Sequence, residues 1–237
     1  MITNNTIFDT LLSGIQDQRI KRVIIGLNWT LVETKNGCGL ASTPARENTL
    51  CLPISGAGNL TKLTTTSAAD LVHSKNPIEI SIGMATINSC YNRYDLVAKN
   101  KNGLDTLVEA DGPITVVGRF PGLNKRFKNI RVIEKNPRQG EYSENDAARL
   151  LSNSAGVIIT SSTLLNGTAA NLIRLSENAR ICLVGPSTPL APKLLDLGIE
   201  CLGGTIVTDI KKMIVAVSQG GDVKTLKPFG LFKVISR

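Results

Sequence analysis

The chain has 237 residues, of which 42% are hydrophobic, 4% aromatic and 19% charged, and its formal net charge is +8. This composition is typical of a globular protein and excludes a disordered, collagen-like or disulfide-scaffold chain. Because His73 is the one histidine, sites that need two or more histidines, including the HExxH metalloprotease pattern, are excluded as well.

The first half of the chain mixes helical and strand-like patterns. Its β-branched runs are joined at Asn36-Gly37, a dipeptide typical of a tight hairpin turn. Pro77 suits the first turn of a helix, and the polar segment 99–103 is the best candidate for a linker. The expected elements are a helix at 5–15, a hairpin of strands 23–34 and 38–43, a third strand at 49–54, and helices at 66–73 and 77–91.

After Pro113 the pattern becomes a regular alternation of apolar β-rich runs and helix-compatible stretches. Continuous apolar strands that alternate with helices predict a parallel sheet covered on both faces. The fold class is therefore α/β, with a small α+β domain at 1–111 and a Rossmann-like domain at 112–237. Strands are expected at 114–118, 130–134, 156–160, 181–185 and 199–202, and helices at 123–128, 144–152, 168–177, 191–197 and 209–218.

Targeting and membrane signals are missing from the sequence, which predicts a cytoplasmic protein with no membrane partner. The polar segment 1–13 lacks the basic and apolar regions of a secretory signal. No run reaches the ~18 apolar residues that a membrane helix needs. The five cysteines are scattered and never form a CxxC pair, as expected for free thiols in a reducing compartment.

The positive charge is concentrated in one segment. Residues 1–111 carry 10 basic and 10 acidic side chains, whereas 112–237 carry 17 basic and 9 acidic ones. Segment 119–138 holds seven of these basic residues against Glu134 alone. In the predicted topology this segment follows the first strand of the parallel sheet, so the positive potential lies near the ligand-binding end of such sheets.

The loops that leave the carboxyl ends of the predicted strands are rich in glycine and hydroxyl side chains, among them Gly185 and Gly204. In a parallel sheet these are the loops that bind ligands. Two of them, 166–168 and 187–189, are expected to lead into helix N-termini, where backbone amides and the helix dipole favour carboxylate or phosphate. The plainer interpretation is that their Ser, Thr and Asn residues only cap helices.

Motifs of common enzymes are absent. Glu134 stands where dinucleotide-binding folds carry a ribose-binding acid, but the accompanying GxGxxG is missing and no GxxxxGK[ST] occurs. His73 ends a predicted helix, where its charge suits the helix dipole better than a catalytic role. The basic run 125–128 could contact nucleic-acid phosphates, although aromatic residues for base stacking are scarce.

Several stretches resemble a prokaryotic family of domains of unknown function that is named for heavy-metal chelation. They span nearly the whole chain in the expected order, and the last two are the most specific. The matching stretches are 25–30 with 37–43 (GCGLAST), 82–89 (IGMATINS), 117–121 (VGRFP), Glu134 with Pro137, 203–204, 160–166 (TSSTLLN) and 185–192 (GPSTPLAP).

The resemblance implies an enolase-like N-terminal domain, a Rossmann-like domain and a ligand cleft between them. A divalent heavy metal is the cofactor that the family name suggests. The sequence shows no cluster of thiolates or carboxylates for one, although folding could assemble a site from Cys38, Glu134 or Asp209. By matching position, the cleft residues would be Asn88, Gly118, Arg119, Phe120, Glu134, Thr160, Asn166, Ser187 and Thr188.

Three functions remain open from the sequence. The first is binding of a small anionic molecule or metal chelate in the cleft, beside the basic segment. The second is an enzyme that acts on such a metabolite, for which no nucleophile or acid–base pair is evident. The third is nucleic-acid association through 119–138, which the missing recognition motifs disfavour. A homodimer is also compatible with the pattern.

Overall fold

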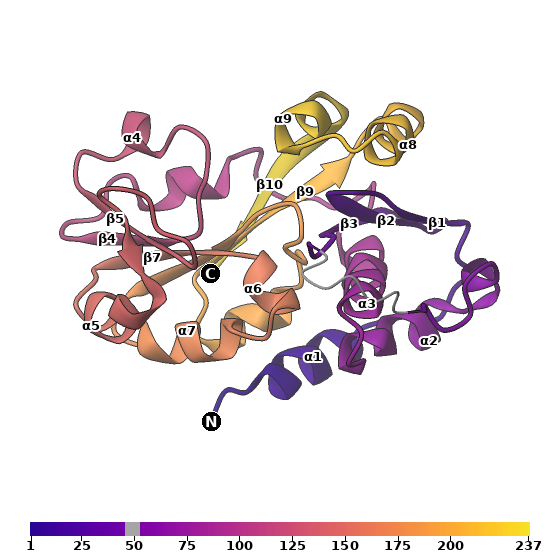
Figure 1. Ribbon diagram of the computed structural model, residues 1–237, viewed down its shortest axis with the longest axis horizontal. Helices are drawn as coiled ribbons and strands as arrows, with labels where there is room; N and C mark the ends of the chain where they lie inside the picture. Colours follow the sequence, from indigo (N-terminus) through magenta and orange to yellow (C-terminus); the bar gives the residue numbers. More distant parts are fainter. Residues whose placement is uncertain (46–52) are drawn as a thin grey trace.

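The computed structural model describes residues 1–45 and 53–237, and the chain forms two sheets (Figure 1). One sheet has three antiparallel strands, and the other has seven strands. The predicted third strand at 49–54 lies largely outside the described residues, and 53–54 are not in a strand. Among the described residues no helix is long and apolar enough to cross a bilayer.

The small sheet comes from the first half of the chain. The run 23–34, expected as one strand, is two strands, because the Gly26 amide donates to the Trp29 carbonyl (2.9 Å) and closes a tight turn. Asn36-Gly37 forms the predicted hairpin turn between the second and third strands. The elements are α1 (Asn4–Leu12), β1 (Arg22–Ile25), β2 (Trp29–Glu33), β3 (Cys38–Ser42), α2 (Thr65–Ala69) and α3 (Pro77–Tyr91), with 3-10 turns at 60–62 and 70–73.

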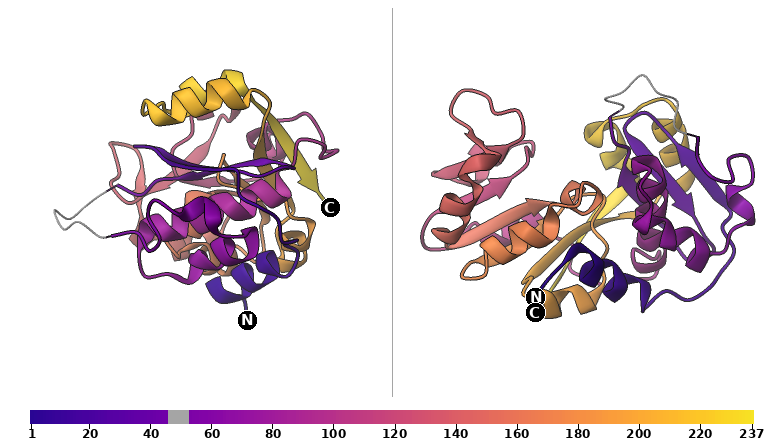
Figure 2. Two further views of the ribbon diagram at one scale, coloured as in Figure 1. Left: turned by 90° about the vertical axis from the view of Figure 1, so that its right-hand side faces the viewer. Right: turned by 60° about the horizontal axis from the view of Figure 1, so that its bottom comes forward.

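Alternating side chains of the small sheet enter two different cores. Val32 and Ala41 pack with α3, whereas Leu31 and Leu40 pack with the C-terminal helices α8 (Ile210–Ser218) and α9 (Val223–Leu226). This alternation is the period of two that a strand imposes on its side chains. Figure 2 shows α8 and α9 (yellow) beside the small sheet. These C-terminal helices therefore complete a hydrophobic core on one face of the N-terminal sheet.

The large sheet contains all five strands predicted from the sequence. Its order is β10-β9-β8-β7-β4-β5-β6, parallel except for β10, which pairs antiparallel with β9. The short edge strand β6 and the strand β10 were not predicted. The residues of β10 are mostly half-exposed, and neither strand carries a continuous apolar run. The strands are β4 (Ile114–Val117), β5 (Ile130–Glu134), β6 (Tyr142–Ser143), β7 (Gly156–Thr160), β8 (Arg180–Val184), β9 (Cys201–Val207) and β10 (Gly230–Ser236).

Helices cover both faces of the large sheet, as predicted. Ile159 of β7 packs in a core with α5 and α7, whereas its neighbour Ile158 packs with α4 and the 3-10 turn at 103–107. That turn includes the end of the expected linker 99–103, and the Lys99 amide donates to the Val234 carbonyl at the sheet edge (3.1 Å). The remaining elements are α4 (Leu123–Arg126), α5 (Ala147–Ser152), α6 (Ser162–Leu165) and α7 (Ala169–Leu175), with 3-10 turns at 103–107, 144–146, 192–197 and 227–229.

The strand order reverses between β4 and β7. From β4 the chain continues outward to β5 and β6, then returns to place β7 on the other side of β4. Loops that leave two such strands diverge to opposite faces, so a crevice opens at their carboxyl ends. The topology thus places a candidate binding site after Val117 and Thr160.

Candidate functional site

A cavity of about 520 Å³ lies at the carboxyl ends of the central strands. The loops after β4, β7 and β8 line it together with β9, the start of the 3-10 turn at 103–107, and α9. Trp29 and Ser42 of the small sheet also line it, so both sheets contribute to its walls. Its size falls within the roughly 300–1,000 Å³ of typical small-molecule sites.

Two glycines bring the loops close to the neighbouring strand end. A Cβ at Gly118 would lie 2.7 Å from the Thr160 side chain, and one at Gly185 would lie 2.6 Å from the Ser161 hydroxyl. Both glycines also have positive φ angles, +100° and +138°, which disfavour any other residue. The glycine and hydroxyl content of these loops therefore has a packing cause, and the same packing shapes the cavity.

Among the described residues, five cationic and no acidic side chains line the cavity. Arg126 donates to the Asp105 carboxylate (2.7 Å), and Arg119 pairs with Glu141. Within the described ranges the three lysines of the lining have no ion pair. The cations are Arg119, Lys125 and Arg126 from the segment around α4, and Lys224 and Lys227 from α9 and the turn after it.

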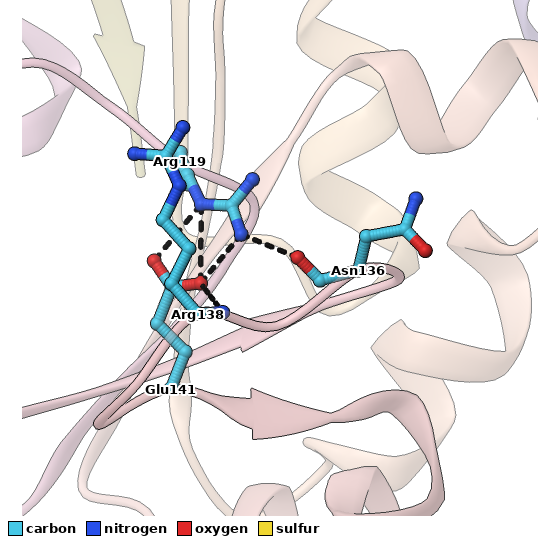
Figure 3. Close-up of polar contacts among 4 residues, drawn as sticks. All are labelled: Arg119, Asn136, Arg138 and Glu141. Carbon is cyan, nitrogen blue, oxygen red and sulfur yellow. Dashed lines mark hydrogen bonds and ion pairs between the residues drawn. The ribbon is translucent and has the colours of Figure 1, made fainter.

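Arg119 is held in place by a neighbouring carboxylate (Figure 3). Its Nε and Nη2 donate to the two Glu141 oxygens at 2.5–3.1 Å, and Nη2 also donates to the Asn136 carbonyl (2.6 Å). The Arg138 amide donates to the same carboxylate (2.8 Å). Glu134 lies near enough for its charge to raise the pKa of Arg119, after the larger effect of Glu141. A ligand would thus meet a guanidinium whose position is already set.

The ion pair predicts an unusual acid titration. The hydrogen bond from Arg119, with that from the Arg138 amide, lowers the pKa of Glu141 to about 2. Because the folded-state pKa is depressed, the stabilisation is complete above the unfolded value of 4.5 and is lost as pH falls toward 2. We expect carboxyl NMR to show Glu141 titrating near 2, and at a higher pH, closer to the ordinary glutamate value of about 4.3, in Arg119→Gln. An unchanged midpoint in that variant would contradict this assignment.

Asn88 of α3 and Asn92, the residue that follows this helix, hold the loop 185–190 against the small sheet. Asn88 Nδ2 donates to the Leu40 carbonyl (2.7 Å) and to the Ser187 carbonyl (3.0 Å). Asn92, one helical turn later, donates to the Thr188 carbonyl (3.0 Å) and accepts from the Leu190 amide (2.8 Å). These buried bonds fix the loop that forms one wall of the cavity.

The predicted site residues divide into three groups. Arg119, Phe120, Thr160, Gly185, Ser187 and Gly204 line the cavity. Gly118 does not line the cavity but packs closely against the Thr160 side chain. Asn88 and Thr188 do not line it either, and both are fully buried. Glu134 and Asn166 are not among the lining residues; the exposed Asn166 accepts from the Thr168 amide (3.1 Å) in a local turn.

The expected helix N-termini are not at the cavity. Residues 187–189 lead into further loop, because the next helical turn starts at Pro192 after Ala191. The loop 166–168 does precede α7, but its residues do not line the cavity. Neither predicted helix N-terminus therefore contributes to the site, and the cationic side chains of the lining supply its positive charge.

Several residues that line the cavity come from parts of the chain to which the sequence assigned no site. Lys224 and Lys227 lie in a segment to which no element or role was assigned, and their spacing of three was the available signal. Trp29 is buried, and its indole N–H has no hydrogen-bond partner in the described structure. Phe232 belongs to the unpredicted strand β10. His73 does not line the cavity, and its ring packs edge-on against the Phe8 ring.

The described residues do not suit direct binding of a heavy-metal ion. No group of three or more His, Cys, Asp and Glu side chains comes together among them. Cys38 is buried, and burial raises its pKa. Cys182 and Cys201 are register neighbours on β8 and β9, and the hydrogen bond between the two thiols raises the pKa of Cys182 and lowers that of Cys201. Among the described residues, folding thus does not bring Cys38, Glu134 and Asp209 together in a group that could hold a metal ion.

Comparison with known proteins finds two family models, each described as "Putative heavy-metal chelation". The model of DUF364 matches residues 102–236, and that of DUF4213 matches 8–91. An uncharacterised protein of Methanocaldococcus jannaschii is 28% identical over 159 residues, which are 62% of this chain and 61% of that relative. The matched region thus spans less than two thirds of the curated relative.

Two solved structures are similar over the whole chain. A DUF364 protein of unknown function from Desulfitobacterium hafniense is 29% identical, with a TM-score of 0.87 and 98% of each chain covered. A second, from Pyrococcus horikoshii, is 22% identical, with a TM-score of 0.79 and 99% of each chain covered, and shows the shared fold.

Proposed function

Since the chain belongs to the DUF364 family, which is described as "Putative heavy-metal chelation", we propose that it binds a small multivalent anion in the cavity beside β4 and β7. The anion would be a metal-chelating molecule or its negatively charged metal chelate. The observation that supports this most directly is the lining of the cavity, whose described residues include five cationic and no acidic side chains. Positive potential in a concave site raises the local concentration of anions and repels free metal cations.

The proposal reconciles the family description with the residues present. A soft metal ion needs clustered thiolates or imidazoles, and a hard ion needs several carboxylates. The lining instead offers lysine and arginine donors beside the hydroxyls of Thr160, Ser161 and Ser162. Such donors recognise carboxylate, phosphate or phenolate oxygens. Metal would then enter this site already bound to an anionic chelator.

The test is a titration with citrate, a small trianion, at low ionic strength. Calorimetry gives the affinity, and emission of Trp29, the one tryptophan of the chain, reports occupancy of the cavity it lines. Replacing Lys125, Lys224 and Lys227 together by glutamine is expected to weaken citrate binding by about 100-fold or more, since each charge-assisted hydrogen bond contributes about 1.5–3 kcal/mol. Added salt should also weaken binding.

A matched control removes the same charge elsewhere. The exposed Lys21, Lys35 and Lys75 do not line the cavity, and their replacement by glutamine should change citrate affinity by less than about threefold. Absence of citrate binding, or equal weakening in both triple variants, would contradict the proposal. So would Zn²⁺ alone changing Trp29 emission at lower concentration than citrate does.

A further inference from the structure

The apolar part of the same cavity narrows the class of ligand. Aromatic rings of Trp29, Phe120 and Phe232 line it, together with Val184 of β8 and Leu104 of the 3-10 turn at 103–107. Phe120 and Phe232 are half-buried, so part of each ring is open to solvent. A purely polar anion such as phosphate would gain no affinity from this apolar surface. Ligand pockets gain affinity from apolar side chains when an apolar part of the ligand removes them from water.

The cations stand on two sides of this apolar surface. Lys125 belongs to α4, which follows β4, whereas Lys224 and Lys227 belong to the segment between β9 and β10. In the sheet, β7 and β8 separate β4 from β9. Three strand spacings correspond to about 14 Å. Figure 1 likewise shows α4 and α9 well apart above the same edge of the sheet.

We propose that the ligand is an elongated dianion with an apolar aromatic middle. Its ring system lies against Phe120 and Phe232. One anionic group reaches Lys125, and the other reaches Lys224 and Lys227. This inference rests on the proposed anion-binding function and specifies its ligand class. Arg119, already oriented by Glu141, adds a donor beside the α4 end. Offset stacking on an aromatic ring adds affinity beyond the area that is buried.

The experiment compares two dianions of similar length. Naphthalene-2,6-dicarboxylate has an aromatic middle, and galactarate has a hydroxylated one. Calorimetry with the wild-type protein should show the naphthalene compound binding at least ~30-fold more tightly, because only its middle buries apolar surface. Energy transfer from Trp29 to the naphthalene ring should report the same binding at the cavity.

Ring-removing variants separate the aromatic contacts from charge. Phe120→Ala with Phe232→Ala should weaken naphthalene-2,6-dicarboxylate by at least ~10-fold and leave galactarate within about twofold. Phe120→Leu with Phe232→Leu keeps apolar volume in case the alanine pair unfolds, and should weaken only the naphthalene compound, by about threefold. The triple lysine variant should weaken both dianions.

Each outcome decides between the two proposals. If both dianions bind alike, or if the phenylalanine variants bind the naphthalene compound as wild type does, the aromatic ligand class is wrong while anion binding stands. If citrate, galactarate and the naphthalene compound all bind without dependence on the cavity lysines, both proposals are wrong.

Discussion

Replacing Gly39 with alanine is expected to destabilise the protein by more than about 3 kcal/mol, beyond the usual range for overpacking. A Cβ at this position would lie 2.0 Å from the Ala85 carbonyl oxygen and 2.3 Å from the Ser89 amide nitrogen. Both atoms belong to the backbone of α3, so no change of rotamer can relieve the contact. Strand β3 and α3 would have to separate, which would open the core that supports the loop 185–190. Urea unfolding measures the change.

Gly140→Ala is the matched control for this prediction. Gly140 has a positive φ of +84°, and a Cβ there would have no atom within 4 Å. Its replacement should cost only about 1–2 kcal/mol from backbone strain. Equal destabilisation by the two substitutions would show that the packing of β3 on α3 is looser than described.

Replacing Asn92 with alanine is expected to destabilise the protein by about 3–5 kcal/mol, since each buried group left unpaired costs about 1–3 kcal/mol. The Asn92 amide donates to the carbonyls of Thr188 (3.0 Å) and Thr205 (3.2 Å) and accepts from Leu190 (2.8 Å). Since the loop 185–190 lines the cavity, citrate binding should also weaken, by at least ~10-fold, under conditions where the variant stays folded.

Asn153 provides the comparison for Asn92. Its side chain also donates to a backbone carbonyl, that of Arg149 (2.8 Å), but it is exposed, so water replaces the lost partner. Asn153→Ala should therefore cost less than about 1 kcal/mol and leave citrate binding unchanged. If Asn92→Ala binds citrate as tightly as wild type, the asparagine supports the fold but not the site.

Much of the large sheet could be predicted from the sequence because its strands are buried on both faces. Runs such as 156–160 and 181–185 are continuously apolar, and no other element of that length needs such a pattern. Edge strand β10 was not predicted because its side chains are mostly half-exposed. Its pairing with β9 stabilises it, and a local sequence pattern does not reveal that pairing. The turn after Gly26 was missed because the run 23–34 contains β-branched residues before the turn, at 23–25, and again after it, at Thr30 and Val32.

Only those residues of the candidate site that lie at the ends of predicted strands could be identified from the sequence. Strand ends place Arg119, Thr160 and Gly185 together, because carboxyl ends of parallel strands share one edge. Glu134 also lies at a strand end, but β5 is separated from the cavity by β4, and no local sequence pattern encodes strand order. Asn166 carries the signal of a functional loop, and its side chain instead closes a turn.

The sequence by itself determined the element types, the alternation that makes a parallel sheet, and the concentration of positive charge in 119–138. These follow from local periodicity and from composition, which need no knowledge of distant neighbours. The tertiary structure decided that only part of this charge faces the cavity, and that Lys224 and Lys227 join it from a segment about 100 residues later. Convergence of distant segments depends on strand order and packing, which are properties of the whole chain.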